Sequence, residues 1–191
     1  MKRALILSVI LGLGASLSAQ DWTIAAKLGF VSAQGDLASL TYTHQGLMGE
    51  LSAQKNLSEG LDIRVHAGHM VVRRETFTGL SASDARTNAA DAKNTWGGAE
   101  FVYAFFGQKL DLYTGPTLNQ WDFIGARQGP LGDTNWHMGW RAGATWKVNA
   151  KWGVDVHYGL SEWARFTPTA PAGPARQVNP SWVGVAARYV F

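Results

Sequence analysis

Apolar and polar residues alternate with a period of two along most of the chain, which is the pattern of β-strands with two different faces. The clearest run is 136–148, in which Trp136 and Trp146 share one face while Arg141 and Lys147 share the other. Seven further segments show the same period: 22–31, 40–54, 61–68, 96–106, 110–119, 152–161 and 182–191. After residue 21 no stretch has a convincing helical period. The pattern therefore predicts an all-β chain of eight strands.

The connections between these segments are of two kinds. Short connections are expected at 34–38, 55–60, 107–109 and 149–151, and long ones at 75–94, 122–135 and 167–180. Outer-membrane barrels have short turns on the periplasmic side and longer loops outside. We therefore expect an eight-stranded antiparallel up-and-down transmembrane β-barrel, with both ends of the chain on the periplasmic side.

The spacing of tryptophans on one face fits a bilayer. Trp136 and Trp146 are ten steps apart. At a rise of about 3.3 Å per residue and a strand tilt of about 40°, their vertical separation is about 25 Å, which is the height of the apolar band of such barrels. We expect aromatic girdles at the two membrane interfaces, formed by Trp22, Trp136, Trp146, Trp152, Tyr189 and Phe191.

The chain ends on a strand whose last residue is aromatic. One face of 182–191 carries Val183, Val185, Ala187, Tyr189 and Phe191. This resembles the terminal strand of bacterial outer-membrane barrels, in which a final Phe after alternating apolar residues is the signal read by the barrel-assembly machinery. Nearly all of residues 20–191 resembles the small eight-stranded barrels of the OmpA and OmpX type, without the peptidoglycan-binding domain that some of them carry. The resemblance implies outer-membrane lipid and the assembly machinery as partners.

The first 19 residues have the three parts of a secretory signal peptide. Lys2 and Arg3 form a basic start, 4–13 an apolar run and 15–19 a small-residue cleavage region. The apolar run is too short to span a bilayer. We expect cleavage near Ala19, export through the general secretory pathway and an outer-membrane barrel domain at 20–191.

Composition narrows the class of protein. Without Lys2 and Arg3, 15 of the 17 basic residues remain against 14 acidic ones, so nucleic acid is not an expected partner. The absence of cysteine excludes disulfides and thiolate metal sites, and no cofactor is expected. The 22 glycines and nine tryptophans, with only 16% charged residues, are typical of a tightly curved barrel rather than a soluble helical domain.

The face opposite the apolar residues carries charges of both signs. An eight-stranded barrel is just wide enough for side chains to fill it, and a buried charge is tolerated only when it is paired. We therefore expect an interior salt-bridge network of Lys27, Glu50, Arg64, Glu100, Arg141, Lys147, Asp155 and Arg188. The expected neighbours are Glu50 with Arg64 or His66, Glu100 with Arg141, and Asp155 with Arg188 and Lys147.

These observations favour a structural or surface-interaction role, with a plugged lumen and loops that meet an unidentified extracellular ligand. Three alternatives remain open: a narrow ion-conducting pore through the same charges, a lipid-acting outer-membrane enzyme, and a soluble periplasmic ligand-binding barrel. The last would place apolar residues inside and charges outside, and would not need tryptophans spaced to a bilayer.

Hydrolytic and metal chemistry are both poorly supported by spacing. Asp155, His157 and Ser161 share a face, but His157 and Ser161 are about 13 Å apart along one strand, beyond hydrogen-bond reach. His66 and His69 fall on opposite faces and are not expected to share a metal. We expect no catalytic residues and no enzyme activity.

Overall fold

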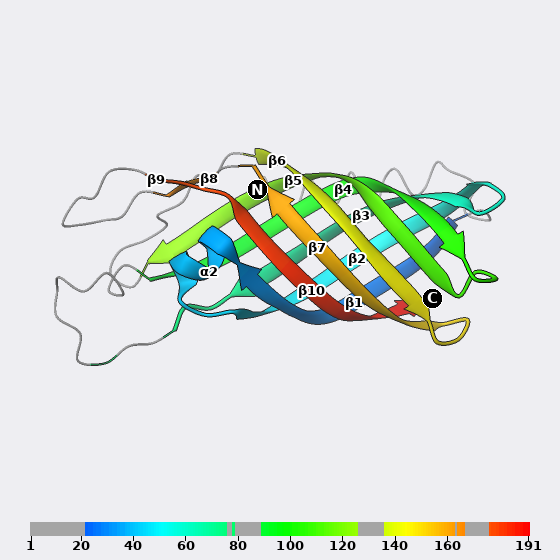
Figure 1. Ribbon diagram of the computed structural model, residues 1–191, viewed down its shortest axis with the longest axis horizontal. Coiled ribbons are helices and arrows are strands. Elements are labelled where there is room, and N and C mark those ends of the chain that lie inside the picture. Colours follow the sequence, from blue (N-terminus) through cyan, green and yellow to red (C-terminus); the bar gives the residue numbers. More distant parts are fainter. Residues whose placement is uncertain (1–21, 76–77, 79–88, 126–135, 163, 167–175) are drawn as a thin grey trace.

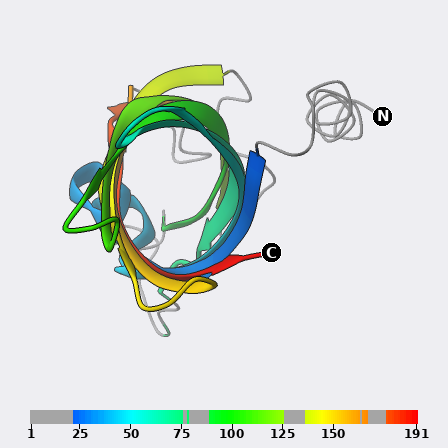
Figure 2. The same cartoon turned by 90° about the vertical axis from the view of Figure 1, so that its right-hand side faces the viewer.

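Eight antiparallel strands form a closed barrel (Figures 1 and 2). The computed structural model describes residues 22–75, 78, 89–125, 136–162, 164–166 and 176–191; the expected signal peptide lies outside them. Around the barrel the strands are ordered β1-β10-β7-β6-β5-β4-β3-β2, and β1 closes the ring by pairing with β10. Their bounds are β1 (Trp22–Gln34), β2 (Gln45–Ser58), β3 (Leu61–Val72), β4 (Ala90–Phe105), β5 (Leu110–Gly125), β6 (Trp136–Lys147), β7 (Trp152–Ser161) and β10 (Pro180–Val190). The predicted fold is confirmed.

The two ends of the barrel differ. Short turns join β2 to β3, β4 to β5 and β6 to β7, at the end where Trp22 and Phe191 also lie (Figure 1). We call this the turn end and the opposite one the loop end. A small sheet of β8 (Ala164–Phe166) and β9 (Arg176–Val178) belongs to the connection between β7 and β10.

A short helix, α2 (Gly35–Thr41), stands where the sequence predicted a connection and the start of a strand. The prediction of no helix was wrong, and β2 begins at Gln45 rather than near residue 40. Leu37 and Leu40 are three residues apart, so they share one helix face, and both are buried. The helix packs against β1, β4 and β10 at the loop end (Figure 1).

Five strands, β1, β3, β4, β5 and β10, extend further toward the loop end than predicted, and the last three reach into the expected long loops. β4 begins at Ala90, β5 runs to Gly125 and β10 begins at Pro180, so parts of all three expected long loops are strand. Ala90, Ala92 and Phe123 in these extensions are buried. In the sequence, the polar residues next to these side chains made the segments resemble loops. They are strands that are apolar only on the inner face.

The outer face of the barrel is apolar. Leu28 and Phe30 are 73% and 69% exposed, and strands on every side carry similar side chains, while most of the residues that alternate with them point inward and are buried. Among the described residues, no helix is long and apolar enough to cross a membrane.

Candidate functional site in the barrel interior

The turn-end half of the interior holds a layer of paired charges, which we call the charge layer. Lys27 of β1 places Nζ 3.2 Å from Glu50 Oε1 and 2.9 Å from Asp155 Oδ2. The side chains of all three are fully buried. Lys27 therefore joins carboxylates from β2 and β7, the strands on either side of the β1–β10 pair.

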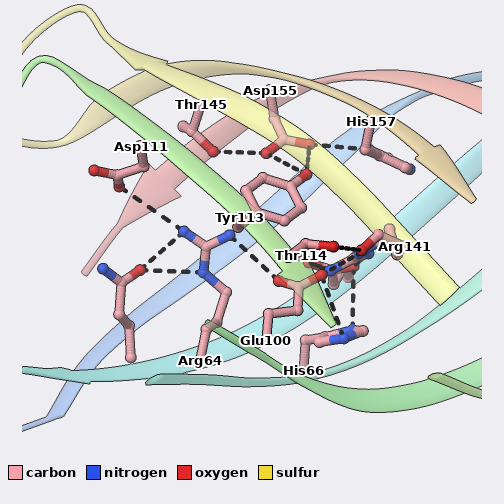
Figure 3. Close-up of polar contacts among 12 residues, drawn as sticks. Arg64, His66, Glu100, Asp111, Tyr113, Thr114, Arg141, Thr145, Asp155 and His157 are labelled. Atoms are coloured by element: carbon pink, nitrogen blue, oxygen red, sulfur yellow. Dashed lines mark hydrogen bonds and ion pairs between the residues drawn. The ribbon is translucent and has the colours of Figure 1, made fainter. Parts of the chain in front are cut away.

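Arg141 of β6 binds two carboxylates at once, of which Figure 3 labels that of Glu100. Its Nε donates to Glu100 Oε1 at 2.6 Å, and both of its terminal nitrogens donate to Glu50, Nη2 to Oε1 at 3.3 Å. In the ring of eight strands β6 and β2 are opposite one another. The Arg141–Glu50 pair therefore spans the lumen.

Arg64 of β3 is held on the turn-end side of this layer. Its guanidinium lies 3.5 Å from Glu100 and 3.9 Å from Asp111, and it donates to Gln54 Oε1 at 2.9 and 3.1 Å. Lys147 Nζ lies 2.8 Å from Asp111 Oδ1. Asp111 thus lies between two cations at the edge of the charge layer.

Tyr113 of β5 lies among these groups (Figure 3). Its hydroxyl donates to Asp155 at 2.9 Å, and its ring centroid is 4.8 Å from Lys27 Nζ and 4.7 Å from the Arg64 guanidinium carbon. Cations over a phenol face are attracted by the ring quadrupole. Tyr113 thus fills the space between the ion pairs and contributes to their cohesion.

The loop-end half of the interior holds a second layer, which is apolar. Trp96, Trp121 and Trp182 point inward and are at most 2% exposed. The ring centroids of Trp96 and Trp182, from opposite strands, are 6.3 Å apart, and those of Trp121 and Trp182 are 5.8 Å apart. We call this the tryptophan layer; the side chains packed with it include Met48, Met70, Phe123, Leu37 and Leu40.

The sequence did not predict the tryptophan layer. The inner faces were expected to carry paired charges, and no layer of aromatic rings was expected inside the barrel. The structure corrects this, because rings from opposite walls meet and leave the loop-end half dry. Trp96 Nε1 approaches Glu50 Oε2 at 3.4 Å and so connects the two layers.

Glycines on neighbouring strands make room for the large inward rings. Gly68 pairs with Trp96, Gly143 with Tyr113 and Gly159 with Trp182. At each glycine an added Cβ would come closer than 3.0 Å to the partner's ring. These contacts account for part of the high glycine content. They could not be recognised in the sequence, because the pairing of each glycine with a ring depends on the strand register.

The predicted girdle residues lie on the outer face. Trp136, Trp146 and Trp152 are 44%, 50% and 51% exposed, and Trp136 is at the loop end while the other five are at the turn end. Tyr189 packs between Trp152 and Phe191, with centroid distances of 4.8 and 5.4 Å. The other members of the expected assembly signal, Val183, Val185 and Ala187, also face outward.

The chain is similar in structure to several outer-membrane barrels that are remote from it in sequence. No protein-family model and no curated protein matches the chain. Neisserial surface protein A matches with a TM-score of 0.52 and 16% identity over 89% of this chain and 97% of that one. Ail, the attachment invasion locus protein of Yersinia pestis, gives 0.54 and 12% over 90% and 98%. A major outer membrane protein of Thermus thermophilus gives 0.50 and 12% over 89% and 99%. The fold is that of the small eight-stranded outer-membrane barrels.

Within this outer-membrane barrel fold, two expected pairings of the charge layer are present. Glu100 meets Arg141 as predicted. Glu50 contacts His66, with Nδ1 3.7 Å from Oε2, rather than Arg64. The hairpin of β2 and β3 therefore supplies the histidine, and not the arginine, as the neighbour of Glu50.

The expected partners of Asp155 are both different in the structure. The prediction that pairs Asp155 with Arg188 was wrong: Asp155 lies opposite Ala186, two residues nearer the loop end, and binds Lys27. Lys147 binds Asp111 across the β5–β6 pair. The register of the neighbouring strands, rather than the distance from the turn, decides these contacts.

Among the described residues, the contacts of the histidines do not link Asp155, His157 and Ser161 into one hydrogen-bonded chain. His157 Nδ1 is 3.0 Å from Asp155 Oδ1, but Ser161 donates to the backbone oxygen of Glu162 instead of joining them. His66 is buried inside, whereas His69 is exposed and contacts Thr95. In the part of the chain that the structure describes, no group of three or more His, Asp or Glu could hold a metal ion.

Proposed function

We propose that this chain is an integral outer-membrane barrel that acts as a closed, non-conducting scaffold, and that its loop end is its interaction surface. The observation that carries the proposal is the filling of the lumen by two stacked layers. Ions would have to pass both the Arg141–Glu50 bridge and the rings of Trp96, Trp121 and Trp182. Buried paired charges and close-packed rings leave no wide aqueous path.

Residence in the outer membrane is supported by the exterior of the barrel. Apolar side chains cover it between aromatic residues at both ends, and the charges lie inside. A soluble ligand-binding barrel would have the reverse polarity. Export by the expected signal peptide at 1–19 and insertion through the assembly machinery are parts of this proposal.

The loop end is proposed as the interaction surface because the long connections are gathered there. By sequence, 73–89, 126–135 and 162–179 join strands at this end, whereas the other end has only short turns. Binding residues are often carried by loops on a rigid scaffold. A protein of the same fold is named an attachment invasion locus protein, which agrees with a surface role of this kind.

A narrow pore is the second candidate, because a cavity of about 340 Å³ enters the lumen from the turn end. Its lining includes Gln54, Lys147 and Arg188 but not Glu50 or Arg141. The cavity therefore reaches the edge of the charge layer without including the bridge across it.

Single-channel recording in a planar bilayer separates the two candidates. The refolded chain without residues 1–19 is expected to show the heat-dependent gel shift of a folded barrel, to float with liposomes and to give no discrete openings. Replacing Arg141 by Ala removes the bridge but keeps the tryptophan layer, so that variant is also expected to stay closed. Combining it with Trp96→Ala, Trp121→Ala and Trp182→Ala is expected to produce openings. Discrete openings in the parent protein that change with Arg141→Ala would establish the pore instead.

A further inference from the structure

The cavity at the turn end is lined by cationic side chains, and not all of them are paired with carboxylates of the charge layer. Lys147, Lys151 and Arg188 line it, together with Gln54, Asn56 and a single acidic residue, Asp62. Its volume of about 340 Å³ is at the lower end of the roughly 300–1,000 Å³ of small-molecule sites. It is therefore large enough for a small ligand and is predominantly positive.

In the part of the chain that the structure describes, Arg188 is the cation of the barrel interior that has no carboxylate partner. Lys27, Arg64, Arg141 and Lys147 each lie within 4.0 Å of at least one carboxylate oxygen. Among the described residues, Arg188 has none within that distance, although it is only 4% exposed. Its one hydrogen bond runs from Nη2 to Gln54 Oε1 at 3.4 Å, and its buried Nε has no partner there.

The acidic residue of the cavity is held by other donors. Asp62 accepts from Gln54 Nε2 at 2.5 Å and from Asn56 Nδ2 at 2.7 Å. The other end of the Gln54 amide is shared between Arg64 and Arg188. Gln54 thus stands between Asp62 and the two guanidinium groups, and Arg188 keeps free donors.

A buried cation without a counter-charge is costly, and an anion from outside can offset that cost. A guanidinium presents its donors as a planar fork that matches the oxygens of phosphate. The geometry points to the turn-end cavity as a binding site for a phosphate oxyanion, with Arg188 as its main ligand and Lys147 and Lys151 as further positive charge. The oxyanion can be free phosphate or the headgroup of a phospholipid in the adjoining leaflet. This inference does not depend on whether the lumen conducts.

The test uses the full barrel refolded in a detergent that contains no phosphate, with inorganic phosphate as the probe. Titration is followed by the arginine side-chain N–H signals in NMR and by calorimetry. We expect a saturable shift of one arginine Nε signal that is absent from Arg188→Gln, and affinity at least about tenfold weaker in that variant, because it loses charged hydrogen bonds. Lys109→Gln removes an exposed charge at the same end and outside the cavity, so its affinity is expected to stay within about twofold of the parent. Arg188→Lys keeps the charge and serves as the variant if Arg188→Gln does not fold.

Nanodiscs distinguish the two sources of phosphate. If the shifted signal appears in phosphatidylglycerol nanodiscs without added phosphate, the headgroup is the ligand; if it appears only on adding phosphate, the free ion is. A parent protein that shows no saturable arginine shift in either setting would overturn the assignment. Phosphate affinity equal to that of the parent in Arg188→Gln, or in Arg188→Lys where Arg188→Gln does not fold, would overturn it as well.

Discussion

Arg141 and Glu50 meet across the full width of the barrel, from strands that are opposite in the ring. They are 91 residues apart in sequence, and both side chains are removed from water. The contact connects two walls that no backbone hydrogen bond joins. It therefore links opposite walls of the closed ring directly, which the strand ladders do not.

Removing one partner of this pair leaves the other buried without its counter-charge. We expect Arg141→Met to lower the free energy of unfolding by about 3 to 5 kcal/mol. The urea midpoint of the heat-dependent gel shift measures this. Lys109→Met removes an exposed cation and is expected to change stability by less than about 0.5 kcal/mol. If Arg141→Met costs no more than Lys109→Met, the bridge does not stabilise the barrel.

The pairing of Gly159 with Trp182 makes a second prediction. A methyl group at Gly159 would collide with the indole, so Gly159→Ala is expected to destabilise the barrel by about 1 to 3 kcal/mol. At Gly97 the nearest atom to an added Cβ is a backbone oxygen at 3.5 Å, an ordinary contact, so Gly97→Ala is the matched control. Adding Trp182→Leu to Gly159→Ala is expected to recover part of the loss. The steric account fails if both glycine variants behave alike.

Tryptophans on the two faces should respond differently to quenchers in the membrane. Trp140 is 49% exposed on the outer face, whereas Trp182 is 1% exposed inside. In bilayers of brominated phospholipid, Trp140→Phe is expected to reduce the quenched part of the fluorescence, and Trp182→Phe to leave it unchanged. Equal losses of quenched signal in the two variants would place the Trp182 ring against lipid and contradict the tryptophan layer.

The terminal Phe191 is expected to affect assembly more than stability. It is 72% exposed at the turn end, and its backbone N–H donates to Ile24 O at 3.1 Å. In proteoliposomes that contain the assembly machinery, Phe191→Ala is expected to slow insertion several-fold, while unassisted refolding in detergent stays near the parent rate. Phe106→Ala is the control, because Phe106 is 73% exposed at the same end but outside the terminal strand. Equal insertion rates for the two variants would show that the terminal ring is not part of the signal.

The sequence by itself determined the strands of the barrel and the face on which most of their residues lie. Alternation is a local property with a period of two, so it identifies the inward side of Lys27, Glu50 and Arg141 without knowledge of the neighbouring strands. The same locality explains the errors. The segment around Leu37 and Leu40 is too short for a helical period to be recognised in the sequence. Ala90 and Ala92 are too small for the alternation of a strand to be recognised at these positions.

Only the tertiary structure decided which inward residues meet. Closing the ring places β2 opposite β6 and β4 opposite β10, which brings Glu50 to Arg141 and Trp96 to Trp182. Asp155 lies opposite Ala186, two residues from Arg188 along β10, and pairs with Lys27. Among the residues that the structure describes, Arg188 therefore has no carboxylate partner. Alternation determines which face of a strand each residue lies on. It does not determine the height and angle at which the side chains cross the lumen. These depend on the register of every pair around the ring, so the filling of the barrel is a property of the closed structure.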